Sequence, residues 1–159
     1  MLKITLLVLG KLKEKYLRDA QAEYAKRLGG LCSFSVVELD PVKLPDKPSD
    51  SQISAALETE GEKLLSKIPA GAAVIPMCIE GSQLSSEELA DKLGKWEMES
   101  SHIVFIIGSS YGLSDKVKAA GSFKLSMSKM TFPHQLARIM LEEQIYRALK
   151  IRAGGAYHK

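Results

Sequence analysis

The chain has 159 residues, of which 45% are hydrophobic and 26% charged, with a formal net charge of +3. This composition is ordinary for a soluble globular protein, and we predict one domain over residues 1–159. No apolar run approaches the ~18 residues that a membrane-spanning helix needs. The cysteines and histidines are scattered, so we predict no metal site. Two free thiols, Cys32 and Cys78, are typical of a cytoplasmic enzyme.

The first part of the chain alternates strands and helices. Residues 2–9 form a nearly continuous apolar run, which predicts a strand buried on both faces. Residues 13–28 have apolar positions at helical spacing and end at two glycines, and residues 34–39 predict a second strand. Residues 40–49 contain three prolines, so we predict a loop there.

The middle of the chain repeats this alternation. Residues 50–68 predict a second helix, and residues 72–79 a third strand that ends in the loop Glu80-Gly81-Ser82. Ser85 and Glu88 have the spacing of a capping box, which predicts a third helix from there to about Gly94.

The last part carries the most informative segments. Residues 103–107 predict a fourth strand, Ser114 caps a short helix, and residues 122–126 predict a short fifth strand. Pro133 then begins a long helix that extends to about Ile151. The alternation predicts an α/β domain with a mostly parallel sheet.

In such a sheet, ligands bind beyond the carboxyl ends of the strands. Three predicted loops lie there, at residues 79–81, 108–112 and 127–132. Their glycines allow close backbone approach, and apolar side chains can wall a flat ring, as a nucleoside-bearing cofactor requires. The sequence lacks both G-x-G-x-x-G and G-K-[S/T], which weakens a dinucleotide site and excludes a standard P-loop.

Two other functional classes remain open from the residues alone. Residues 108–112 match G-x-S-x-G, with Ser110 as the nucleophile of a hydrolase, although the fold that uses this motif is normally larger than ~159 residues. Residues 1–30 hold seven Lys/Arg against three acids and residues 116–159 nine against two, which also fits an RNA-binding module without catalysis.

Four segments together resemble one known family. They read IIGSSYGL from Ile106, LSMSKMTFPHQ from Leu125, EQIYRA from Glu143 and YHK from Tyr157. With the matching N-terminal segment, the similarity covers the whole chain, and it points to the ribosomal RNA large subunit methyltransferase H family, of the SPOUT class. The family usually has a second glycine where this chain has Ser109.

The resemblance implies an α/β sheet with helices on both faces and a C-terminal trefoil knot, in a homodimer. It implies methyl transfer from S-adenosylmethionine to N3 of a pseudouridine in a large-subunit rRNA stem-loop at the intersubunit face. Whether free rRNA, the large subunit or the assembled ribosome is the substrate stays open. The implied and inferred donor-site residues are Met77, Gly81, Gly108, Met127, Ser128, Lys129, Met130, Thr131 and Phe132.

Methylation of this nitrogen needs a base, or a cation that stabilises the developing anion. The candidates are Arg138, Glu143, Tyr157 and His158. Two of them could instead form i,i+4 surface pairs, Arg138 with Glu142 and Glu143 with Arg147. Tyr157 and His158 follow two glycines, so we predict a hinged tail. The last helix is apolar on more than one face, which favours a second copy as its partner.

Overall fold

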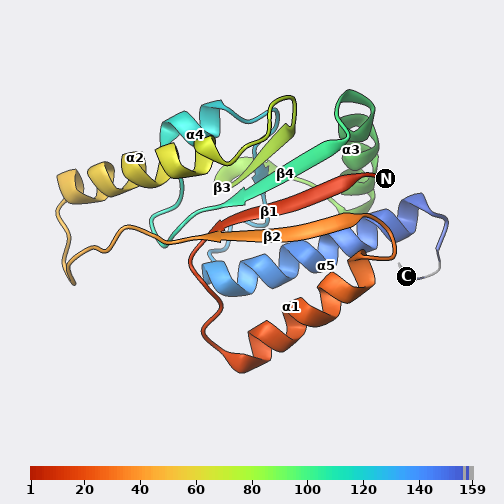
Figure 1. The fold of residues 1–159 in the computed structure, drawn as a ribbon, viewed down its shortest axis with the longest axis horizontal. Coiled ribbons are helices and arrows are strands. Elements are labelled where there is room, and N and C mark those ends of the chain that lie inside the picture. Colours follow the sequence, from red (N-terminus) through yellow and green to blue (C-terminus); the bar gives the residue numbers. More distant parts are fainter. Residues whose placement is uncertain (156, 158–159) are drawn as a thin grey trace.

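Strand β1 (Lys3–Leu9) lies inside a five-stranded sheet in the computed structural model, which describes residues 1–155 and 157 (Figure 1). The other strands are β2 (Ser33–Leu39), β3 (Ala73–Gln83), β4 (His102–Ile107) and β5 (Leu125–Ser126). They lie in the order β2-β1-β4-β3-β5, and each neighbouring pair is parallel. The predicted parallel α/β sheet is therefore confirmed.

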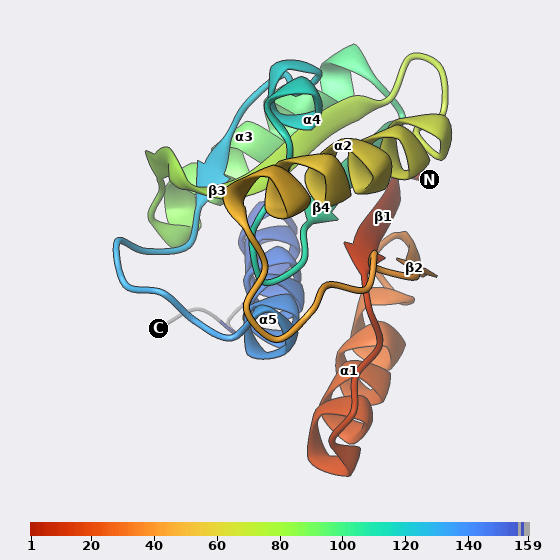
Figure 2. The same cartoon turned by 90° about the vertical axis from the view of Figure 1, so that its left-hand side faces the viewer.

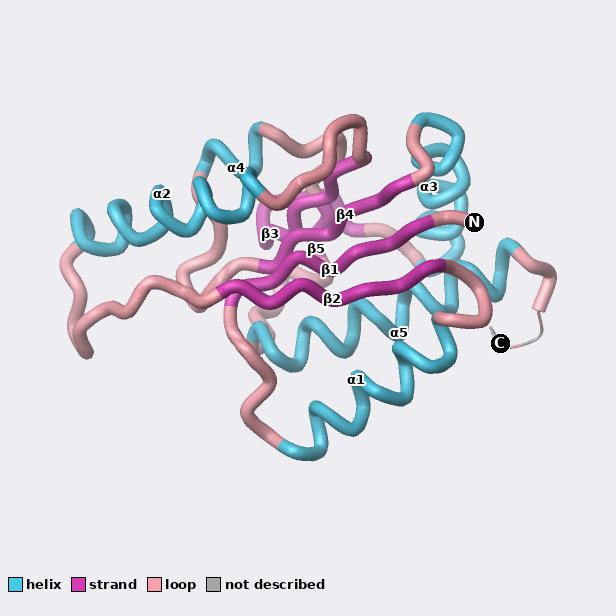
Figure 3. Tube along the Cα trace, in the orientation of Figure 1, coloured by secondary structure: helices cyan, strands magenta, loops and turns pink. Residues whose placement is uncertain are grey.

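Helices cover both faces of this sheet. They are α1 (Lys15–Leu28), α2 (Asp50–Ser66), α3 (Ser86–Glu99), α4 (Asp115–Ala119) and α5 (His134–Arg152). Helix α5 packs against α1 and α3 on one face, whereas α2 and α4 lie together on the other (Figure 2). The tube in Figure 3 shows the strands as the central layer between these two groups.

The alternation of side chains along β1 explains this layering. Ile4, Leu6 and Val8 are buried in the core shared with α3 and α5, and Leu7 and Leu9 are buried in the core shared with α2 and α4. A strand with two buried faces must be apolar at nearly every position, as residues 2–9 are.

Local capping fixes where three helices begin. Ser49 and Gln52 form a reciprocal capping box at α2, and Ser85 and Glu88 form the predicted one at α3. The Ser114 hydroxyl accepts the N–H of Val117 and caps α4, as predicted. These bonds satisfy backbone donors that a helix start leaves without partners.

Three boundaries differ from the sequence prediction. Strand β3 continues through Gly81 to Gln83, because its end pairs with β5 after a register shift. Helix α3 passes Gly94 and ends at Glu99, since Trp96 is buried against two phenylalanines. Strand β5 comprises two residues, not the five predicted.

No helix within the described part of the chain combines the length and apolar character that crossing a bilayer requires. The trefoil knot that the resemblance implies for the C-terminal part stays a prediction.

Candidate functional site

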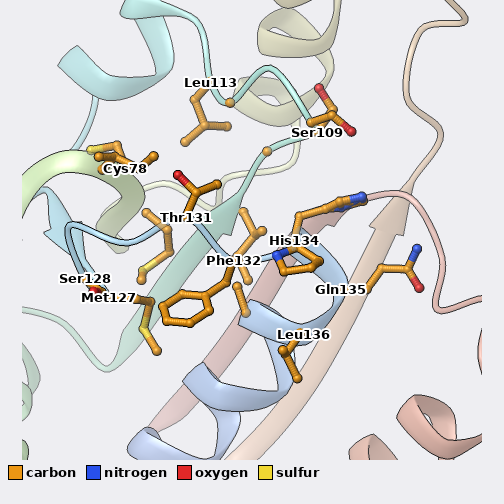
Figure 4. A pocket seen from close by; sticks show the side chains of 18 of the residues that line it. Cys78, Ser109, Leu113, Met127, Ser128, Thr131, Phe132, His134, Gln135 and Leu136 are labelled. Carbon is orange, nitrogen blue, oxygen red and sulfur yellow. The ribbon is translucent and has the colours of Figure 1, made fainter.

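A cavity of about 950 Å³ lies between the middle of β3, the loop after β4 and the segment that leads into α5 (Figure 4). Most of the predicted donor-site residues line it, and they come from three separate segments of the chain. They are Met77, Gly108, Met127, Ser128, Met130, Thr131 and Phe132. The structure thus brings together segments about 50 residues apart, as the parallel sheet predicted.

The loop after β4 has little spare room. An ideal Cβ on Gly108 would lie 2.2 Å from the carbonyl oxygen of Gly112 and 2.6 Å from its carbonyl carbon. The N–H of Gly112 donates to the carbonyl of Ser109 at 2.9 Å, and Gly112 has a φ of 85°. Gly108 therefore allows the close approach, and Gly112 supplies a backbone conformation that other residues rarely adopt.

Ser109 fits this loop without strain. No residue other than glycine has a positive φ within the described chain, so the Cβ of Ser109 is tolerated. Its hydroxyl donates to Oε1 of Glu60 at 3.1 Å, a hydrogen bond that a glycine at this position could not make.

The segment that leads into α5 is held by its own hydroxyl groups. Ser126 donates to the carbonyl of Ser128 at 3.1 Å, and the Ser128 hydroxyl accepts the N–H of Met130 at 3.0 Å. Pro133 then begins α5 as its N-cap. This order places Thr131 and Phe132 at the cavity wall.

Two predicted donor-site residues do not line the cavity. An ideal Cβ on Gly81 would lie 2.8 Å from the backbone of Lys124, and Ser82 N–H donates to the Lys124 carbonyl at 2.9 Å. Gly81 thus lets β3 and β5 approach closely. Lys129 is exposed and lies outside the cavity lining.

The mouth of the cavity carries apolar side chains that were not among the predicted donor-site residues, although two of them belong to the predicted loops 79–81 and 108–112. They are Tyr16, Ile79, Tyr111 and Leu136, and with Met130 they make five of the eight large hydrophobic side chains exposed in the described chain. Such a concentration marks a surface that another molecule covers. Tyr16 reaches the mouth because Lys13 N–H donates to Oε1 of Gln135, a contact that spacing cannot reveal.

The cavity also contains titratable groups that were not among the predicted site residues. Burial lowers the pKa of His134, and the nearby charges of Arg138 and Lys13 lower it further, so its imidazole is neutral at pH 7. A hydrogen bond from Lys118 lowers the pKa of Glu80, and both side chains line the cavity as an ion pair.

Arg138 is placed beside the site and not in its wall. It is 2% exposed, donates to Glu38 at 2.7 Å and to the carbonyl of Gly10 at 3.0 Å, and so ties α5 to the ends of β1 and β2. The alternative of a surface pair with Glu142 is not what the structure shows, since Arg138 and Glu142 are both buried and Arg138 pairs with Glu38.

Glu142 is fully buried, and neither carboxylate oxygen has a hydrogen-bond partner within the described residues. Burial raises the pKa of Glu142 to about 8, an effect that the charge of Arg138 partly opposes. The folded protein thus keeps this proton at pH 7, whereas the unfolded chain releases it above about pH 4.5.

Replacing Glu142 with leucine should therefore stabilise the protein in a pH-dependent way. As pH rises from about 5 to 8, the unfolded state binds fewer protons than the folded state, so the parental free energy of unfolding falls. The free energy of unfolding of Glu142→Leu should exceed that of the parent by roughly 3 kcal/mol at pH 8 and by much less at pH 5. Urea unfolding at pH 5 and at pH 8 measures the free energy of unfolding of both proteins, and Glu99→Leu, at an exposed position, is the control. A stabilisation by Glu142→Leu that is the same at both pH values would contradict the prediction.

The remaining catalytic candidates gather further along α5. Glu143 and Arg147 form the i,i+4 pair that the sequence offered as an alternative to catalysis, at 2.8 Å, and the Tyr157 hydroxyl donates to Glu143 at 3.0 Å. The Tyr157 ring lies edge-on to Tyr146 at 4.9 Å. Burial, followed by the hydrogen bond to Glu143, raises the pKa of Tyr157. The hinged tail is thus wrong for Tyr157, which packs on α5, and His158 lies outside the described residues.

This cluster is distant from the cavity of its own chain. Glu143 follows Ala137, the last residue of α5 that lines the cavity, by six residues, which corresponds to about 9 Å along the helix axis. Within one chain, the geometry therefore separates Glu143 and Tyr157 from the candidate donor site, whereas Arg138 lies beside it.

Ser110 shows none of the contacts that a hydrolase nucleophile needs. It lies exposed in the loop after β4, and its hydroxyl bonds to no histidine in the part of the chain that is described. An activated serine requires a base within hydrogen-bond reach.

Comparisons with known proteins agree with this geometry. A family model described as "Predicted SPOUT methyltransferase" matches residues 2–158. The chain is 50% identical to ribosomal RNA large subunit methyltransferase H of Bifidobacterium adolescentis and 47% identical to that of Lactococcus lactis subsp. cremoris, over 99% of this chain and 100% of each relative. The Clostridium acetobutylicum protein of the same name is 50% identical over 98% of this chain and 99% of its own. The chain therefore belongs to the SPOUT methyltransferases and, within them, to the ribosomal RNA large subunit methyltransferase H family.

Proposed function

We propose that this protein transfers a methyl group from S-adenosylmethionine to N3 of a pseudouridine in large-subunit rRNA, acting in the cytoplasm. The observation that carries the proposal is the cavity of about 950 Å³ at the strand ends, with a tight glycine loop on one side and Met127 to Phe132 on the other. This volume and lining suit a nucleoside-bearing donor.

Methyl transfer depends more on how the donor and the acceptor are positioned than on reactive groups of the protein. Transfer from a sulfonium is an in-line displacement, so the nitrogen, the methyl carbon and the sulfur must be aligned. The N3 proton must also leave, and the negative charge that develops on the ring must be stabilised. The Glu143–Arg147–Tyr157 cluster and His158 offer an acceptor, a cation and an aromatic ring for stacking on a splayed base.

The direct test is methyl transfer with labelled S-adenosylmethionine to free 23S rRNA, isolated large subunits and assembled ribosomes, each carrying the unmethylated pseudouridine. Nuclease digestion and mass spectrometry would locate the label. Incorporation at N3 of a pseudouridine in one of these substrates is expected. Donor binding in calorimetry without any transfer to the three RNAs would contradict the proposed acceptor.

A second copy of the chain can bring the separated groups together. One chain holds Glu143 about 9 Å along α5 beyond the lining of its own cavity, and the cavity mouth exposes apolar side chains. We propose a homodimer in which the tail of one subunit covers the cavity of the other. Sedimentation at micromolar concentration should give about twice the 17.4 kDa chain mass; a monomer with full methyl transfer would contradict this proposal.

Ser110→Ala should leave methyl transfer largely unchanged, because the Ser110 hydroxyl has no role in the proposed chemistry. A serine-directed phosphonate should likewise fail to label the parent protein. Initial rates of methylation and intact-protein mass spectrometry measure the two results. Stoichiometric labelling at Ser110 would restore the hydrolase hypothesis.

A further inference from the structure

Glu60 lies in α2 and, although it carries a carboxylate, is only 3% exposed. Its two oxygens bond to different segments of the chain. Oε2 accepts the N–H of Val42 at 2.9 Å, and Oε1 accepts the hydroxyl of Ser109 at 3.1 Å. Burying a carboxylate is unfavourable unless its oxygens are hydrogen-bonded, so both contacts matter to the folded state. One side chain thus joins the proline-rich loop to the loop that borders the cavity.

The next residue of α2 contacts the other end of the same loop. An ideal Cβ on Gly61 would lie 2.5 Å from the Ser114 hydroxyl oxygen and 3.3 Å from Val117. Gly61 thus lets α2 pack closely against the start of α4. Glu60 and Gly61 together fix residues 109 and 114, which bracket the tight turn on the cavity wall.

We infer that Glu60 is a positioning residue for the methyl donor, acting through Ser109 on the shape of residues 108–112. The inference rests on the proposed function, because it takes S-adenosylmethionine as the occupant of the cavity. The turn itself is closed by the bond from Gly112 N–H to the Ser109 carbonyl. Anchoring Ser109 by its side chain keeps that turn in one arrangement before the donor arrives, so less order has to be imposed on binding.

The test is calorimetry with S-adenosylmethionine, together with steady-state methylation, on the full chain. Ser109→Ala and Glu60→Ala should each weaken donor affinity about tenfold. Each should raise KM for the donor and leave kcat at saturating donor nearly unchanged. Glu60→Gln keeps an acceptor for Val42 and an amide for the Ser109 hydroxyl, so it should recover most of the affinity. Glu62→Ala, an exposed acid on the same helix, is the matched control and should bind as the parent does.

The double variant decides whether Glu60 acts through Ser109. Glu60→Ala/Ser109→Ala should bind no more weakly than Glu60→Ala alone, because both changes remove the same hydrogen bond. Additive losses, or parental affinity in Ser109→Ala, would overturn the inference while leaving the proposed function intact. Should Glu60→Ala fail to fold, Glu60→Gln takes its place, and Glu60→Gln/Ser109→Ala should bind no more weakly than Ser109→Ala alone. A parent protein that does not bind S-adenosylmethionine would overturn the proposed function and the inference with it.

Discussion

Gly108→Ala should weaken S-adenosylmethionine binding by roughly a hundredfold or more, while the chain still folds. The added Cβ would lie 2.2 Å from the Gly112 carbonyl oxygen and 3.0 Å from a methyl carbon of Leu113. The nearest atoms belong to the backbone, which cannot rotate away as the end of a side chain can, so the whole turn must shift. Overpacking of this kind typically involves 1–3 kcal/mol, and about 3 kcal/mol corresponds to the hundredfold change in affinity.

Gly108→Val should abolish binding altogether, because it fills the same position with a larger side chain. The measurement is calorimetry with S-adenosylmethionine, paired with thermal unfolding to show that the variant is folded. Gly30→Ala is the control, since its Cβ would meet only the Arg27 carbonyl at an ordinary 3.7 Å and it does not line the cavity. Unchanged affinity in a folded Gly108→Ala protein would remove this loop from the donor site.

Deleting residues 156–159 should lower methyl transfer by roughly a hundredfold or more and leave donor binding nearly unchanged, which is the scale expected when a general base or positioning group is lost. The deletion removes Tyr157, which donates to Glu143 and lies under the Arg147 guanidinium, and it removes His158. Glu143, which accepts the Tyr157 hydroxyl, lies about 9 Å along α5 beyond the last residue that lines the cavity of its own chain, so losing this contact should not disturb the donor.

Single-turnover methylation of ribosomes at saturating donor, alongside calorimetry, separates the two effects. His158→Ala alone should reproduce much of the loss in turnover, and Tyr157→Phe tests whether the hydroxyl bonded to Glu143 is needed. A deletion that methylates at the parental rate would move the catalytic role to Arg138 or Glu143. A deletion that loses donor binding would instead place the tail in the donor pocket.

The parts of the fold that local sequence determines were predictable. The continuous apolar run of β1 predicted a strand with two covered faces, and Ser85 with Glu88 predicted the start of α3. The parallel sheet then predicted that residues 79–81, 108–112 and 127–132 would meet at one edge of the sheet. The cavity lining bears out that meeting, except that Gly81 does not line the cavity.

The features that the sequence did not predict depend on contacts between segments that are far apart in the chain. Arg138 has an acid four residues later, yet its partner is Glu38, 100 residues earlier, because α5 lies against the ends of β1 and β2. Strand β3 extends past Gly81 only because β5 pairs with it there. In the sequence, Glu60 is one of several acidic residues on a predicted helix. Only the folded structure shows that its two oxygens accept hydrogen bonds from Val42 and Ser109.

The strand order also affects how the chain is made. Strand β1 pairs on one side with β2, which follows soon after it, but on the other side with β4, about a hundred residues later, as Lys3 opposite His102 shows. During synthesis, at roughly 5–20 residues per second, the β1–β2 pair must therefore wait several seconds with one apolar edge unpaired. Such an edge is a template for pairing with other chains. A nascent chain that stalls before β4 should thus be aggregation-prone, and the sheet can close only late in translation.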